Sequence, residues 1–201
     1  AILITGAPGT GKSILSLQFA LAGAKDKESV LYISSEENLP LLKETAKSIN
    51  IDIDEYKNYF FIVKQSFERG QVFSLTEPIS IIKRKKVKRV VLDSLTLFNY
   101  IYNKNEQEFR RGVLDFIVKM KEMSVTLLVT SEKNTLNIDE LEFEPQDFLF
   151  DGLIILTRVR RGSSYERVLL VAKMRGQELL LDIFPMQIKE GGITVFTKQL
   201  P

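Results

Sequence analysis

A glycine-rich segment at residues 6–13 is the first feature whose residue types and spacing could do chemistry. It reads Gly-Ala-Pro-Gly-Thr-Gly-Lys-Ser, a full match to the phosphate-binding pattern G-x-x-x-x-G-K-[ST]. An apolar run at 1–5 precedes it, and a segment with helical apolar spacing at 12–24 follows, so the match stands between a strand and a helix. A glycine-rich turn before an ordinary helix is the plainer alternative.

Glycines let backbone N–H groups close around a phosphate at a helix N-terminus. We therefore predict that this loop binds a nucleoside triphosphate with Mg²⁺. Lys12 would contact the β- and γ-phosphates, and the Ser13 hydroxyl would be a Mg²⁺ ligand. The predicted nucleotide-binding residues are Gly6, Pro8, Gly9, Thr10, Gly11, Lys12, Ser13 and Ile14.

Carboxylates follow two later apolar runs. Asp93 ends the run at 90–92 and is expected to reach the metal through water, although such an Asp is often only a turn or cap residue. Glu36 and Glu37 follow the run at 29–34, and one of them, Glu36 by preference, would orient the attacking water. Alternatively, the pair merely favours the N-terminus of a helix that begins near Asn38.

The elements that must position these residues alternate along the chain. Strands are predicted at 1–5, 29–34, 59–63, 87–92 and 125–130, and helices at 12–24, from 38, at 77–85 and at 105–123. This order implies a parallel sheet with helices on both sides. From residue 152 the apolar period becomes two, which predicts antiparallel strands at the sheet edge, at 153–157, 167–174, 179–183 and 193–196.

Composition limits the chemistry that is available. The 201 residues, 44% hydrophobic and 27% charged, indicate one domain over 1–201. The absence of Cys and His excludes disulfides, Cys/His zinc sites and imidazole catalysis. The apolar run at 14–24 is too short to span a membrane, and we expect a cytoplasmic location. Because the chain opens on a strand, we also expect that a segment upstream of Ala1 is missing.

Six segments together resemble the RecA-like ATPases of the KaiC type. Besides the phosphate loop they are Tyr-Ile-Ser-Ser-Glu-Glu at 32–37, Arg-Val-Val-Leu-Asp-Ser-Leu-Thr at 89–96, Thr-Ser-Glu at 130–132, Asp-Gly at 151–152 and Lys-Met-Arg-Gly at 173–176. The resemblance implies an α/β RecA-like P-loop NTPase fold, with a mostly parallel twisted sheet flanked by helices and C-terminal antiparallel edge strands.

The same resemblance implies an ATPase that assembles as a homo-oligomeric ring, usually a hexamer, with each nucleotide at a subunit interface. Lys173 and Arg175 would then reach the γ-phosphate of the neighbouring subunit, joining Lys12, Glu36 and Glu37 as catalytic residues. The sequence suggests no target for Lys173 and Arg175 within their own subunit, and the plainer alternative is an exposed strand face. Clock-type members carry a Ser-Thr pair where this chain has Asp147 and Phe148, so we do not expect autophosphorylation.

Three charged segments of the sequence indicate which kinds of partner the protein could bind. The basic run at 83–89 is best explained by a helix C-terminus, whereas the four arginines around Gly162 would either blunt an edge or bind a neighbour's phosphate or acidic surface. The acidic stretch at 133–147 would repel nucleic acid. With Leu141, Phe143 and Phe148 it either contacts a protein partner or is a solvated loop.

Three hypotheses follow. The preferred one is a slow Mg²⁺-dependent ATPase. The second is a protein in which ATP only holds subunits together, and the third, less favoured, is a recombination accessory protein.

Overall fold

The computed structural model describes residues 1–35, 37–64, 76–96, 106–133, 143–179 and 182–197. Nine strands form one sheet in the order β3-β2-β4-β5-β1-β6-β7-β8-β9. The strands are β1 (Ile2–Gly6), β2 (Val30–Ser34), β3 (Phe60–Lys64), β4 (Arg89–Asp93), β5 (Thr126–Glu132), β6 (Gly152–Arg161), β7 (Ser164–Met174), β8 (Ile183–Lys189) and β9 (Gly192–Val195). Pairing is parallel from β3 to β6 and antiparallel from β6 to β9. The expected mixed sheet is confirmed.

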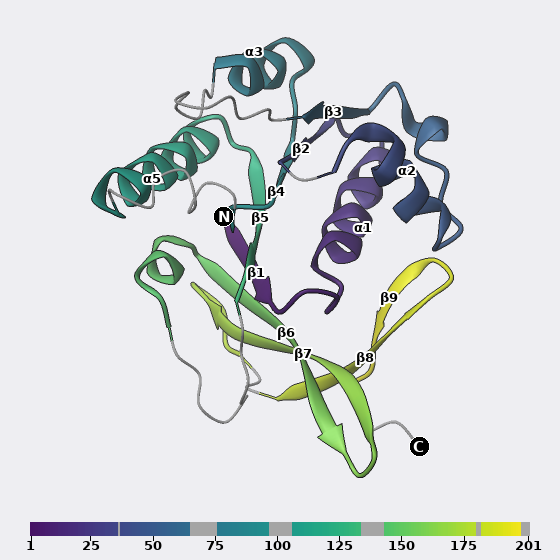
Figure 1. Cartoon of the computed structure of the whole chain (residues 1–201). Coiled ribbons are helices and arrows are strands. Elements are labelled where there is room, and N and C mark those ends of the chain that lie inside the picture. The colour runs from purple at the N-terminus through teal and green to yellow at the C-terminus, as the bar shows by residue number, and fades with distance from the viewer. Residues whose placement is uncertain (36, 65–75, 97–105, 134–142, 180–181, 198–201) are drawn as a thin grey trace.

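Helices cover both faces of this sheet (Figure 1). They are α1 (Lys12–Lys25), α2 (Leu39–Lys47), α3 (Thr76–Lys85) and α5 (Glu106–Glu122), with short 3₁₀ helices η1 (Ile53–Tyr56) and η2 (Pro145–Leu149). One apolar core joins α1 and α2 to one face, and the other joins α3 and α5 to the opposite face. Because both faces are covered, the central strands are continuously apolar, as in the fully buried β2.

Local signals account for the helix starts. The α2 helix begins after Asn38, whose side chain accepts a hydrogen bond from the Leu41 amide at 3.1 Å, with Pro40 in the first turn. The α3 helix ends on Lys83, Arg84 and Lys85, which accords with the explanation of the basic run as a helix C-terminus.

One predicted strand is misplaced. The sequence predicts a strand at 179–183, whereas β8 begins only at Ile183 and continues to Lys189. Residues 180 and 181 lie outside the described residues. Pro185 within β8 has no amide hydrogen to donate, which weakens the strand signal of this stretch, yet its carbonyl accepts a hydrogen bond from the Phe196 amide at 2.9 Å.

The β8–β9 hairpin packs on α1 within one apolar core and is also hydrogen-bonded to it through the Gln18 side chain. The Gln18 amide donates to the Ile193 carbonyl at 3.2 Å and accepts from the Ile193 amide at 2.9 Å. Within the described residues, no helix is long and apolar enough to cross a membrane.

Candidate functional site

A cavity of about 380 Å³ opens at the carboxyl ends of the parallel strands. The phosphate loop and the start of α1 form one wall, through Pro8, Gly9, Gly11, Lys12, Ser13 and Ile14. Asp93 and Ser94 after β4 and Glu132 at the end of β5 form a second wall, and Arg167 of β7 and Ile188 of β8 complete the lining. Six of the eight predicted nucleotide-binding residues therefore line one cavity together with Asp93.

The Lys12 side chain turns back into the phosphate loop. Gly9 and Gly11 have φ values of 73° and 112°, which side-chain-bearing residues rarely adopt. Lys12 is 8% exposed, and its Nζ donates to the carbonyls of Gly6 at 2.9 Å and Ala7 at 3.1 Å. These bonds hold the ammonium group inside the curve of the loop, where an anion bound by the loop would meet it.

Asp93 is buried at the end of β4, between the ends of β2 and β5. Its two carboxylate oxygens accept hydrogen bonds from Tyr32 Oη at 2.6 Å and Thr130 Oγ1 at 2.5 Å. The next residue, Ser94, is joined to Asp93 by a cis peptide bond. Its amide donates to Ser35 Oγ at 2.7 Å, and its carbonyl accepts from the same hydroxyl at 2.9 Å. These bonds tie the ends of β2 and β4 together.

The acidic pair beyond β2 is described only in part. Glu36 lies outside the described residues. The Glu37 amide donates to Ser34 Oγ at 3.0 Å, and the Ser35 amide donates to the Asp93 carbonyl at 2.8 Å. The segment that carries the acidic pair therefore leaves β2 directly beside Asp93.

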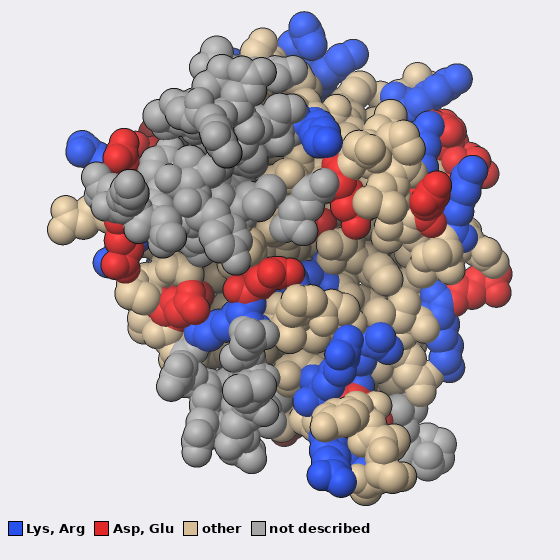
Figure 2. Space-filling model, viewed as in Figure 1, with Lys and Arg blue, Asp and Glu red and all other residues tan. Residues whose placement is uncertain are grey.

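Two arginines from the β6–β7 hairpin face the phosphate loop, and sequence reasoning did not assign them to it. Arg158 Nη2 donates to the Gly9 carbonyl at 2.8 Å. Arg167 is paired with Arg158 in the strand register and lines the cavity. Lys and Arg also gather over this hairpin on the molecular surface (Figure 2). The only sequence signal was the cluster of arginines around Gly162, and the register decides which of them face the loop.

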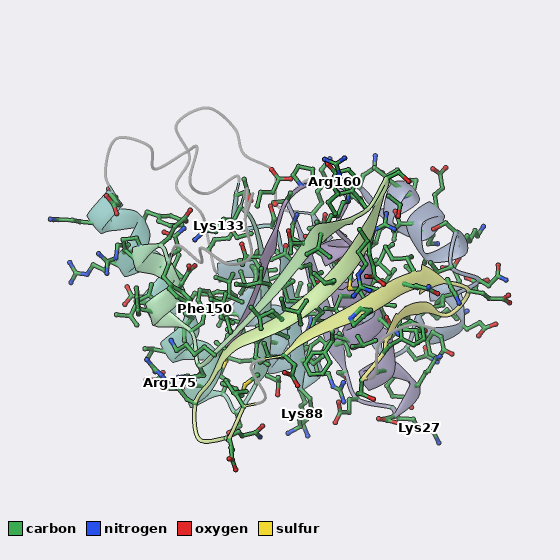
Figure 3. The ribbon with its side chains drawn as sticks, turned by 90° about the horizontal axis from the view of Figure 1, so that it is seen from below. Lys27, Lys88, Lys133, Phe150, Arg160 and Arg175 are labelled. Atoms are coloured by element: carbon green, nitrogen blue, oxygen red, sulfur yellow. The ribbon has the colours of Figure 1, made fainter. Side chains whose placement is uncertain are left out.

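Lys173 and Arg175 lie at the other end of the same two strands, as the labelled Arg175 and Arg160 illustrate (Figure 3). Lys173 is paired with Leu153 and Arg167 with Arg158, so at about 3.3 Å per residue their positions along the sheet differ by roughly 17 Å. Lys173 and Arg175 therefore lie away from the two arginines that face the phosphate loop of their own chain.

The expectation that Lys173 and Arg175 lack a target in their own chain is wrong. Lys173 Nζ donates to the Phe150 carbonyl at 2.7 Å, and Arg175 forms an ion pair with Asp151 at 3.4 Å. Arg175 also donates to the Phe148 carbonyl at 3.3 Å. The sequence does not reveal these partners because they include main-chain carbonyls in and just after η2.

Burial and neighbouring charged groups shift the pKa values of Lys173 and Asp151. Burial and the neighbouring Arg175 guanidinium lower the pKa of Lys173, while Asp151 and Asp147 oppose that shift. Burial raises the pKa of Asp151, but hydrogen bonds and neighbouring positive charge, Lys121 foremost, outweigh burial and lower the pKa. Asp151 is therefore an anion at neutral pH and a stable anchor for Arg175.

The acidic stretch at 133–147 is only partly described, since residues 134–142, including Leu141, lie outside the described residues. Lys133 and Asp147 form an ion pair at 3.5 Å. Phe143 and Phe148 are 47% and 60% exposed, with ring centroids 6.2 Å apart. Of these two exposed rings, Phe148 lies next to Lys173, whose Nζ is 5.9 Å from the ring centroid.

Fold and site together define a class: an α/β protein of the RecA-like P-loop type, with the phosphate loop between β1 and α1 and an acidic residue at the end of β4. A family model described as "ATPase: KaiC" matches residues 1–200. The chain belongs to this KaiC ATPase family.

Individual relatives agree with this assignment. The circadian clock oscillator protein KaiC of Prochlorococcus marinus is 31% identical over 210 residues, which cover 96% of this chain and 41% of that protein. The corresponding protein of Parasynechococcus marenigrum is 30% identical, over 96% of this chain and 40% of its own length. The chain thus spans about 40% of the length of these relatives.

A solved structure shows the same fold. The crystal structure of a KaiC-like protein from the hyperthermophilic archaeon Pyrococcus horikoshii OT3 superposes with a TM-score of 0.83 at 26% identity, covering 97% of this chain and 88% of that one. The prediction of a KaiC-type, RecA-like fold is confirmed.

Proposed function

We propose that this protein is a Mg²⁺-dependent ATPase that acts in a homo-oligomeric ring, a hexamer by family resemblance, with each ATP at a subunit interface. The observation that carries the proposal is the single cavity in which the phosphate loop, Asp93 and Glu132 meet. In a P-loop enzyme, catalysis depends mainly on positioning the phosphates and stabilising their charge.

The phosphates would be bound by the loop amides at the N-terminus of α1 and by Lys12. The lysine ammonium already lies within the loop, 2.9 Å from the Gly6 carbonyl. A triphosphate that occupies the loop would therefore meet a cation that is already held in place.

The donor set fits Mg²⁺. Ser13 supplies a hydroxyl and Asp93 a carboxylate to the same cavity, and Mg²⁺ in nucleotide sites combines such oxygen groups, bound directly or through water, with phosphate oxygens. The ion would neutralise charge on the phosphates, while Ser13 and Asp93 would hold it in place.

Glu36 or Glu37 would orient the attacking water. The segment that carries the acidic pair leaves β2 next to Asp93, because Ser35 forms hydrogen bonds with both Asp93 and Ser94. From this edge of the sheet, one of the two carboxylates would accept a proton from a water in line with the γ-phosphate.

Lys173 and Arg175 would serve the neighbouring subunit's nucleotide. Their positions roughly 17 Å along the sheet from the loop-facing arginines prevent them from reaching their own site, whereas a ring brings this end of one subunit against the loop of the next. A cation delivered across the interface neutralises charge on the transferred phosphoryl group. The hydrogen bond from Lys173 to the Phe150 carbonyl and the ion pair of Arg175 with Asp151 hold the two side chains at this end of β7.

One experiment tests the proposal directly. Light scattering with and without Mg-ATP measures assembly, and phosphate release is assayed in the same samples. We expect ATP to increase the mass and phosphate to be released slowly. The E36Q/E37Q variant should bind ATP and assemble but release no phosphate above background, and retained turnover would refute the role of the acidic pair.

The same data separate the ATPase from a protein that uses ATP only for assembly. Assembly without phosphate release in the unmodified protein would favour the assembly protein. Phosphate release without any ATP-dependent change in mass, in a protein that stays monomeric, would refute the role given to Lys173 and Arg175.

A further inference from the structure

The Asp93 carboxylate is held from both sides by hydroxyl groups of neighbouring strands. Tyr32 on β2 donates to Oδ2 at 2.6 Å, and Thr130 on β5 donates to Oδ1 at 2.5 Å. Tyr32 and Thr130 are 0% exposed, and Asp93 is 8% exposed. We call these three residues the carboxylate clamp.

Strand register produces the clamp. Tyr32 is paired with Val91, and Ser34 with Asp93, so Tyr32 lies two positions before Asp93 on the neighbouring strand. Two positions along a strand bring side chains back to the same face, about 6.6 Å further on. The length of a tyrosine side chain spans this offset, whereas phenylalanine would fill the same space without a donor for the carboxylate.

Packing fixes the direction in which the Tyr32 hydroxyl points. The ring is stacked on Phe60 with centroids 6.2 Å apart, and it belongs to the core beneath α1. A buried hydroxyl is costly unless it forms a hydrogen bond, and a bond to a carboxylate is among the stronger kinds. Tyr32 and Asp93 therefore restrict each other to one orientation.

We propose that Tyr32 and Thr130 are positioning residues, which fix the Asp93 carboxylate in the orientation that engages the Mg²⁺ ion of a bound nucleotide. This inference rests on the proposed function, because it concerns how Mg²⁺ is held in that site. With both oxygens already oriented, Asp93 loses no rotational freedom when the ion binds. The cavity side of the carboxylate stays available, since Asp93 lines the cavity together with Ser13.

The test separates metal binding from nucleotide binding. The affinity for ADP is measured by calorimetry in EDTA and again in Mg²⁺, and their ratio is the Mg²⁺ enhancement. Y32F removes one donor and keeps the ring, and T130V removes the other hydroxyl while keeping a β-branched side chain. For each variant we expect the affinity in EDTA to stay within about twofold and the enhancement to fall about tenfold, the usual scale for the loss of a partner that orients a metal ligand.

A double variant tests whether Tyr32 acts through Asp93. D93N should remove most of the enhancement, and Y32F added to D93N should remove no more, because the group that Tyr32 orients has already been altered. Y59F is the matched control: Tyr59 is half-buried in the same core but precedes β3, away from the cavity. It should keep the full enhancement.

Each result of these binding measurements either supports the carboxylate clamp or overturns it. An unchanged enhancement in folded Y32F and T130V overturns the clamp and leaves the proposed function intact. Equal losses of affinity in EDTA and in Mg²⁺ assign the two hydroxyls a purely structural role, which also overturns it. If Y32F does not fold by circular dichroism, T130V and the T130V/D93N pair decide alone. An unmodified protein that binds no ADP contradicts the proposed function and, with it, this inference.

Discussion

Replacing Gly192 by alanine should loosen the hairpin that closes one side of the cavity. Gly192 has φ of 110°, and a Cβ there would lie 2.7 Å from Gln18 Oε1 and 2.8 Å from its Cδ. Ordinary carbon–carbon contact begins near 3.5 Å, so Gln18 would have to retreat by about 0.7 Å. That shift breaks the paired hydrogen bonds between Gln18 and Ile193.

The magnitude follows from two contributions. The backbone strain of alanine at this φ costs about 1–2 kcal/mol, and the loss of the two hydrogen bonds costs about 1–2 kcal/mol more. Urea unfolding should therefore show a free energy of unfolding lower by about 2–4 kcal/mol. The control is G112A, because Gly112 is an exposed position inside α5 with nothing within 4 Å of its Cβ, and alanine there should stabilise the protein by about 0.5–1 kcal/mol.

A second comparison isolates the role of Gln18. In a Q18A background the displaced side chain is already absent, so G192A should cost only its backbone strain, about 1–2 kcal/mol. A full cost of G192A in that background, or a G192A protein as stable as the unmodified one, would refute this explanation of how the hairpin is held.

Three further predictions concern single contacts. N38A removes the acceptor for the Leu41 amide at the start of α2 and should lower the free energy of unfolding by about 1 kcal/mol in urea; an unchanged midpoint would contradict it. S35A leaves the buried Ser94 amide without its acceptor and should cost about 1–3 kcal/mol, with faster hydrogen exchange at Ser94, whereas unaltered exchange would argue against the bond. R175A removes an ion pair of a largely exposed side chain, so stability should change by less than about 0.5 kcal/mol while ATP turnover falls, and undiminished turnover would count against its role across the interface.

Local signals made the helices and most strands predictable. The phosphate loop follows from its own eight residues, and the start of α2 follows from Asn38 and Pro40. The two sheet halves follow from the change of apolar period at residue 152. The late start of β8 was missed because Pro185 lowers the strand signal of a segment that pairing with β7 nevertheless stabilises.

The contacts in the site that depend on how neighbouring strands are paired could not be predicted from the spacing of residues in the sequence. Arg158 and Arg167 lie side by side because β6 and β7 pair those two positions, and the alternation along a strand, which puts Arg158 and Arg160 on one face, does not show which of the two reaches the loop. The same limit applies to Tyr32, whose place in the segment at 32–37 does not reveal that its hydroxyl contacts Asp93.

By itself the sequence determined the phosphate loop, the strand-bound Asp93 and the KaiC-type order of motifs, because each depends on neighbours within a few residues. Only the tertiary structure decided that Tyr32 and Thr130 hold Asp93. It also decided that Lys173 and Arg175 are anchored at the end of β6 and β7 that lies away from the loop. The physical reason is that hydrogen bonding between strands fixes which distant residues stand side by side, and a shift of one position would turn each of these side chains to the other face.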